Sequence, residues 1–142
     1  MVVMIAGILT AVAIPRLQFG WVHRSKAETT AWKIVTDLRR ARSLAILNAA
    51  NKPDGYGLNM ETSGERSHYE IVDLGTSSTV DSHTLDSSIV HTGSQEFAFN
   101  RLGALKEGSD STVALSTTEK TFTITVVSAT GMVKCVESSA GD

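Results

Sequence analysis

Cysteine is almost missing from this chain of 142 residues, because Cys135 is the only one. A single thiol excludes a disulfide framework and a cage of thiolate metal ligands, and we expect it to be a small buried side chain. Common catalytic motifs are missing too: there is no G-x-S-x-G serine, no glycine-rich phosphate loop, and no pair of histidines four residues apart. We therefore expect no catalytic residue, no metal site and no cofactor, and we expect surface positions for His23, His68, His83 and His91.

A strong net charge is missing as well, since the formal net charge is -2. This value hides a split, because the chain up to Ala50 has seven basic and two acidic side chains, whereas the remainder has six basic and thirteen acidic ones. A basic front and an acidic remainder do not make one continuous nucleic-acid surface. Arg39, Arg40 and Arg42 are candidate contacts for DNA or another anion, but beside Asp37 on a helix such a cluster is more often a solvated face. Nucleic acid is therefore not an expected partner.

The first residues, Met1 to Ile14, have no charge at all, and Pro15 and Arg16 end this apolar run. As a helix the run covers only about 20 Å of a hydrocarbon core roughly 30 Å thick. Its apolar side chains would point all round the helix, which makes a soluble core helix awkward. A cleaved signal peptide has support from the A-x-A pattern at Ala11–Ala13, although no Lys or Arg precedes it. We favour a third interpretation, a membrane-spanning helix that lacks a few residues at its start.

Further along the chain, the spacing of apolar residues changes from a helical to a strand period. From Ala27 to Ala50 they recur every three or four residues, which predicts an amphipathic helix. Alternation in the range 56–136 predicts antiparallel strands, as at Phe97–Asn100 and Thr121–Val126, and the polar stretch Gly75–Ser88 is expected to be a surface loop. The predicted fold class is α+β, with one long N-terminal helix, apolar in its first half and amphipathic in its second, packed on an antiparallel β-sheet. Residues 1–26 would form the apolar helix and hinge, and residues 27–142 the globular domain.

The opening stretch MVVMIAGILTAVAIPRL resembles the hydrophobic N-terminus of type IV pilins and type II secretion pseudopilins, with Gly7 and Pro15 at the family's glycine and proline. The stretch LRRARSLAILNAANKP resembles a helix of the H-type minor pseudopilin and FimT-like minor pilins (the GspH/FimT group), and TFTITVVSATGMVKC resembles their C-terminal strands. The basic leader, cleavage glycine and early glutamate of family precursors are not in this sequence. We therefore expect a few residues to precede Met1 in the mature chain.

This resemblance implies a noncatalytic minor pseudopilin or pilin subunit with a pilin-like fold, which is stored in the bacterial inner membrane with a single pass. It would then assemble into a periplasmic or surface filament for type II protein secretion. The implied partners are other pilin or pseudopilin subunits, the inner membrane and the secretion-system assembly platform. Proline removes a backbone donor, so a hinge is expected between Gly7 and Pro15. The side chains expected to pack in the membrane or filament core are Val2, Val3, Ile5, Ile8, Leu9, Val12 and Ile14.

Two other functions stay open. The first is a FimT-like minor pilin involved in pilus assembly or DNA uptake, which the acidic tail VESSAGD disfavours because a DNA-contacting tail is expected to be basic. The second is a secreted binding domain whose first segment is a cleaved signal.

Overall fold

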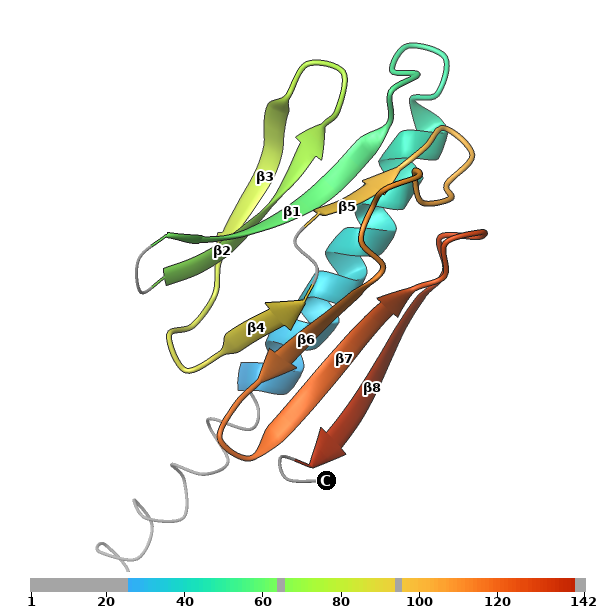
Figure 1. The fold of residues 1–142 in the computed structure, drawn as a ribbon. Coiled ribbons are helices and arrows are strands. Elements are labelled where there is room, and N and C mark those ends of the chain that lie inside the picture. The colour runs from blue at the N-terminus through green and yellow to red at the C-terminus, as the bar shows by residue number, and fades with distance from the viewer. Residues whose placement is uncertain (1–25, 64–65, 94–95, 140–142) are drawn as a thin grey trace, which may run out of the picture.

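The chain folds mostly into β-structure around one helix (Figure 1). The computed structural model describes residues 26–63, 66–93 and 96–139, and its helix spans residues 26–47. The strands form two four-stranded antiparallel sheets, in the orders β3-β2-β1-β5 and β4-β6-β7-β8. Their bounds are β1 (Tyr56–Ser63), β2 (Arg66–Asp73), β3 (Ser78–Thr84), β4 (Val90–Gly93), β5 (Glu96–Phe99), β6 (Thr112–Ser116), β7 (Lys120–Val126) and β8 (Val133–Ser139).

This architecture corrects the predicted fold class. An α+β arrangement with one long helix on an antiparallel sheet, and with it the pilin-like fold, is wrong: the described chain has a short helix and eight antiparallel strands in two sheets. The apolar first half expected for the helix falls on residues 1–25, outside the described residues. The prediction failed because the apolar stripe of an amphipathic helix can be wide enough to contact two sheets. The sequence pattern of the helix does not show how many sheets pack against it.

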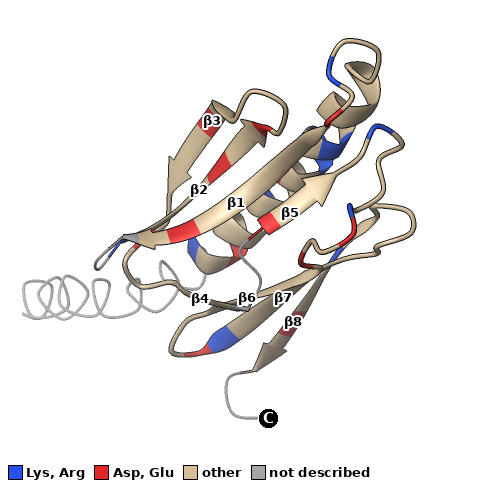
Figure 2. Ribbon diagram, turned by 45° about the horizontal axis from the view of Figure 1, so that its top comes forward, with Lys and Arg blue, Asp and Glu red and all other residues tan. Residues whose placement is uncertain are grey.

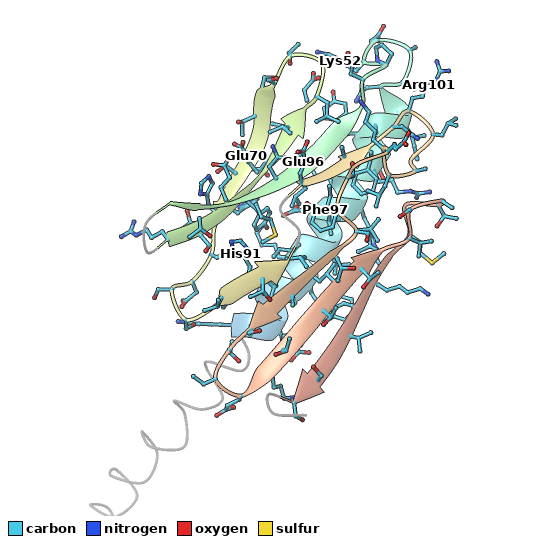
Figure 3. All side chains as sticks on the ribbon, in the orientation of Figure 1. Lys52, Glu70, His91, Glu96, Phe97 and Arg101 are labelled. Atoms are coloured by element: carbon cyan, nitrogen blue, oxygen red, sulfur yellow. The ribbon has the colours of Figure 1, made fainter. Side chains whose placement is uncertain are left out.

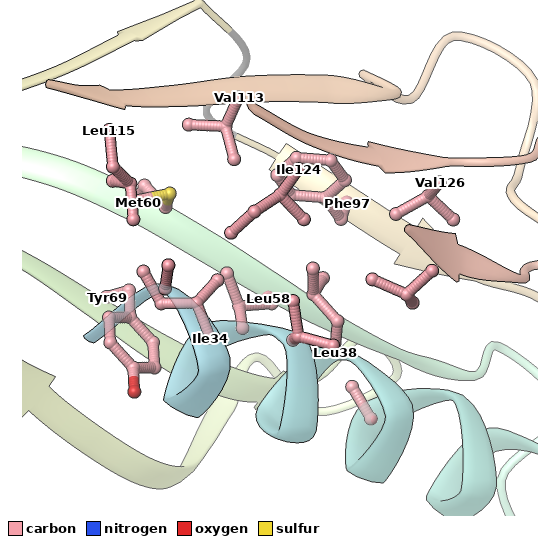
Figure 4. Packing of buried hydrophobic residues seen from close by; sticks show 14 of the residues in the cluster. Ile34, Leu38, Leu58, Met60, Tyr69, Phe97, Val113, Leu115, Ile124 and Val126 are labelled. Carbon is pink, nitrogen blue, oxygen red and sulfur yellow. The ribbon is translucent and has the colours of Figure 1, made fainter. Parts of the chain in front are cut away.

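The helix has the predicted amphipathic pattern. Its buried positions recur every three or four residues and include Ala31, Ile34, Leu38, Ala41 and Ala45. They face the strands, as Ile34 and Leu38 do in Figure 4. The opposite side of the helix is exposed and includes Trp32 and Leu47, with 51% and 80% of their surface accessible. After residue 47 the chain turns, and Gly55, with φ at 86°, leads into β1.

The first sheet is built on the hairpin of β1 and β2, which pair from Tyr56–Asp73 to Ser63–Arg66. Leu58 and Met60 of β1 face the core, so Asn59 between them faces outward. Strand β3 pairs with β2 and has a bulge opposite Ile71 and Val72. This finding corrects the surface loop predicted for Gly75–Ser88, half of which is an edge strand with polar side chains on both faces.

The second sheet ends in the hairpin of β7 and β8, which pair from Lys120–Ser139 to Val126–Val133. The N–H of Gly131 donates to the carbonyl of Val127, and the N–H of Val127 donates to the carbonyl of Met132. This is a G1 bulge, which needs a residue in the left-handed region, and Gly131 has φ at 70°. The turn of this hairpin therefore lies at the SATG stretch, residues 128–131.

One core lies between the two sheets and the helix (Figure 4). From the first sheet come Leu58, Tyr69 and Phe97, and from the second come Leu115 and Ile124, all almost fully buried. Complete burial of one large aliphatic side chain contributes roughly 1.5–3 kcal/mol. The sheets meet where β4 and β5 follow each other, because β4 pairs with β6 of one sheet and β5 with β1 of the other.

Candidate functional sites: a basic groove and an acidic hollow

The three clustered arginines point to different partners. Arg40 leaves the helix toward β3, where its Nη1 lies 2.8 Å from Oδ2 of Asp81. This contact is the main cause that lowers the pKa of Asp81 below its ordinary value. Arg40 is therefore already paired with a carboxylate of its own chain, so Arg39, Arg40 and Arg42 do not act as one cationic patch.

Arg42 connects the helix to two loops. Its Nε donates to the carbonyl oxygen of Gly103 at 3.0 Å and to that of Thr130 at 3.1 Å. The packing here is close, because a Cβ atom on Gly131 would lie 1.8 Å from the Gly103 oxygen and 2.8 Å from Nε of Arg42. Carbonyl acceptors are neutral, and no described carboxylate forms an ion pair with Arg42, so its positive charge stays uncompensated.

Arg39 is exposed and forms no ion pair with any described residue. It lies with Arg42 in a groove of about 370 Å³ between the helix and the β7–β8 hairpin, and the other lining residues are Ser43, Thr130, Gly131, Met132 and Val133. We call these seven residues the basic groove. Two guanidinium groups without a carboxylate can bind a carboxylate or phosphate through paired N–H donors.

A second charged surface, which the sequence did not predict, lies on the outward face of the first sheet. Asn59 of β1 is directly opposite Glu70 of β2 and Glu96 of β5 in the strand pairing. Figure 3 labels the two glutamates on their strands. They line a hollow of about 380 Å³ with Asn59, Val72, Asp73, Leu74 and Ser77. We call these seven residues the acidic hollow. The sequence does show polar residues at alternate positions of these strands. They indicate a cluster only once the pairing register of the strands is known.

The carboxylates of the acidic hollow differ in their partners. Asp73 is 4% exposed and lies 2.6 Å from Nζ of Lys52. The Lys52 contact, followed by the backbone N–H groups of Gly75 and Thr76, lowers the pKa of Asp73, and Asp73 in turn raises the pKa of Lys52. Glu70 accepts only a neutral donor, the hydroxyl of Thr79 at 2.8 Å. Glu70 and Glu96 have no described basic partner, so the hollow keeps a negative charge.

A buried polar network joins the helix to β2 and β3. Asp37 is 6% exposed and accepts a hydrogen bond of 2.6 Å from the hydroxyl of Tyr69. Lys33 Nζ lies 3.9 Å and His83 Nε2 lies 3.8 Å from the same carboxylate oxygen. Burial and then the Asp37 contact raise the pKa of Tyr69, which keeps the hydroxyl protonated as a donor. These contacts occupy both groups, so the network holds the elements together and offers no free nucleophile.

The remaining predicted site residues are placed as follows. His83 and His91, predicted at the surface, are half-buried and hydrogen-bonded, His91 to Thr62 at 2.8 Å. Cys135 packs against the core, and burial raises its pKa. Among the described residues, no three His, Cys, Asp or Glu side chains are grouped to hold a metal ion.

Part of the predicted site cannot be placed, because it lies outside the described residues. This part includes His23, the hinge residues Gly7 and Pro15, and the expected packing residues Val2, Val3, Ile5, Ile8, Leu9, Val12 and Ile14. In the described part, the helix of residues 26–47 is not long and apolar enough to cross a membrane.

The described sites are thus a groove with two uncompensated arginines, a hollow with two uncompensated glutamates, and a polar network inside the molecule. No protein-family model, curated protein or solved structure matches the chain.

Proposed function

We propose that the protein is a noncatalytic subunit of a filament of the type IV pilin and type II secretion pseudopilin class. It would be stored in the bacterial inner membrane and then assembled with other subunits at the secretion-system platform. The observation that carries the proposal is the sequence itself: an uncharged apolar run from Met1 to Ile14, ended by Pro15, lies directly before an amphipathic helix. A helix that is apolar on every side is stable in lipid or against other apolar helices, and not in water.

The described domain does not have the pilin-like fold that the resemblance implied, so its support for the proposal is limited to the placement of its helix and to its two charged surfaces. The helix begins at one end of the molecule (Figure 1), and its buried residues belong to one core with residues of both sheets. The two charged surfaces, the basic groove and the acidic hollow, are candidate interaction surfaces because each has charged side chains without a partner of opposite charge among the described residues. A subunit that only assembles needs such surfaces and needs no reactive group.

The test is to isolate the protein from native bacterial membranes and to determine its N-terminus by sequencing and mass spectrometry. A methylated N-terminus upstream of Met1, together with recovery of the protein in sheared or detergent-extracted filaments, is the expected result. A mature chain that starts near Ile14 and is found free in solution would instead identify a secreted domain and would contradict the proposal.

A further inference from the structure

We propose that this chain associates head to tail with copies of itself, with the basic groove of one copy on the acidic hollow of the next. The proposal deepens the proposed function, and rests on it, because it names the two faces by which such a subunit would meet its neighbours. It assigns a partner to both surfaces, and that partner is a second copy of this chain.

The basic groove supplies donors that have no acidic acceptor in their own chain. Arg39 forms no ion pair with a described residue, and Arg42 is bound only to the carbonyl oxygens of Gly103 and Thr130. Exposed Met132, with 56% of its surface accessible, adds apolar area beside them. A patch of this kind favours a partner with carboxylates at its centre.

The acidic hollow supplies the matching acceptors. Glu70, Asn59 and Glu96 lie in one row across β2, β1 and β5. The Oδ1 atom of Asn59 is buried without a hydrogen-bond donor from the described residues. Lys52, the cation of this region, is held by Asp73. The row thus has the carboxylates of Glu70 and Glu96 available for a guanidinium, whose planar donors fit a carboxylate.

The positions of the two surfaces select a head-to-tail contact. The helix packs on one face of the first sheet, and the hollow lies on the other face. Figure 2 shows acidic positions of β1, β2 and β5 in front of the helix and basic helix positions behind the sheet. Either surface would repel its own copy, since each has charge of one sign, so a two-fold contact of like patches is unfavourable. A contact between unlike patches leaves one free patch of each kind on the pair, so it can repeat from copy to copy and build a ring or an open helical filament.

The test uses the full chain in neutral detergent micelles, with self-association measured by sedimentation velocity at low and high salt. Two variants are needed: Arg39→Glu, and the double variant Glu70→Lys with Glu96→Lys. Each alone is expected to associate about tenfold more weakly than the unmodified chain, because like charges then face each other. An equimolar mixture of the two variants is expected to regain association, since the groove of each again meets an opposite charge.

Matched controls are Arg101→Glu, on the exposed loop after β5, and Glu119→Lys, on the exposed turn before β7. Each control reverses the charge of one side chain, as each substitution in the test variants does, and should leave association unchanged. Circular dichroism should show that all variants stay folded, because Arg39 and Glu96 are exposed.

The proposal is overturned if the unmodified chain stays monomeric at low salt, if the mixed variants do not recover, or if the controls weaken association equally. A chain that has the methylated N-terminus and enters filaments, yet fails this test, is still a filament subunit and contacts its neighbours through other faces.

Discussion

Asp37 is a buried acidic side chain, and its neighbours offset the free-energy cost of its burial. A buried carboxylate is unfavourable unless it is paired and hydrogen-bonded. Here the Tyr69 hydroxyl donates directly, Lys33 contributes positive charge at longer range, and the His83 ring lies 3.8 Å from the carboxylate. The Tyr69 and His83 rings are also in contact, with centroids 5.3 Å apart. The short hydrogen bond is therefore the contact whose loss should matter most.

Tyr69→Phe should lower the free energy of unfolding by about 1–3 kcal/mol, the usual cost of leaving a buried acceptor without its donor. The measurement is urea denaturation followed by circular dichroism. Tyr56→Phe is the matched control, because Tyr56 is also buried but its hydroxyl forms no hydrogen bond with a described residue. Equal losses in the two variants would show that the Asp37 hydrogen bond contributes little.

Asp86 predicts a dependence of stability on pH. The backbone N–H and the hydroxyl of Ser88, with Lys26 as a smaller cause, lower its pKa to about 2. In the unfolded chain its pKa is near 3.8, so the unfolded state takes up the proton first as the pH falls. Its contribution to stability is complete above about pH 4 and is lost between about pH 4 and pH 2.

The variant Asp86→Asn should therefore lose less stability than the unmodified chain between pH 5 and pH 2. Thermal unfolding at several pH values measures this difference. Parallel curves for the two chains across this range would mean that Ser88 and Lys26 do not hold the carboxylate in the folded state.

At the scale of elements, the β7–β8 hairpin depends on one residue without a side chain. A Cβ atom at Gly131 would overlap the carbonyl oxygen of Gly103 and approach Arg42. Gly108 has a similar left-handed φ of 84°, but a Cβ atom there would meet nothing within 4 Å. The two glycines thus separate the cost of the backbone conformation from the cost of the clash.

Gly108→Ala should cost about 1–2 kcal/mol of stability, the price of a left-handed alanine. Gly131→Ala should cost at least about 2 kcal/mol more, because the hairpin must move away from the helix. Chemical denaturation of both variants measures the difference. If both lose the same stability, the close approach of the hairpin to Arg42 is not required for the fold.

The elements found from the sequence were those with a clear local period. The helix predicted over 27–50 is observed over 26–47, and the predicted alternating residues lie in strands β1, β5 and β7. The clearest alternation of buried and less buried residues is in β7, whereas Phe97, Ala98 and Phe99 of β5 are all buried. Strand β3 was missed because its inward residues Asp81 and His83 are polar and bind helix residues, so no apolar alternation marks it. The division into two sheets was missed because it depends on pairings between strands far apart in sequence.

For the candidate sites, too, the sequence predicted the local pattern and missed the contacts between residues far apart in the chain. The sequence has three arginines within four residues, but only the structure shows that Asp81, 41 residues after Arg40, pairs with Arg40 and that Arg39 forms no ion pair with a described residue. The acidic hollow needed the register of three strands. Charge composition predicts signs, and the pairing of distant segments decides which charges remain available.

At the scale of the whole molecule, the acidic excess of the residues after Ala50 predicts weak binding to DNA. Arg40 is paired within the chain, so only Arg39 and Arg42 offset this excess on the helix. Titration of the full chain in neutral detergent with duplex DNA at near-physiological salt should show no binding tighter than the roughly 10⁻⁴ to 10⁻⁶ M of nonspecific contacts.

The result that contradicts this prediction is submicromolar binding that weakens steeply with salt. If that binding also disappears when Arg39, Arg40 and Arg42 are changed to glutamine, the DNA-uptake alternative becomes the better function for the chain.

The core joins the beginning of the described chain to its end, since Ala27 of the helix and Val133 of β8 belong to one buried cluster. Contacts that span most of the sequence form late, because the intervening chain must first be brought together at an entropic cost. During synthesis the helix emerges early, but its apolar stripe has no complete cover until β8 has left the ribosome. The nascent domain therefore passes through a long aggregation-prone stage, and its folding is completed only after nearly the whole chain has been made.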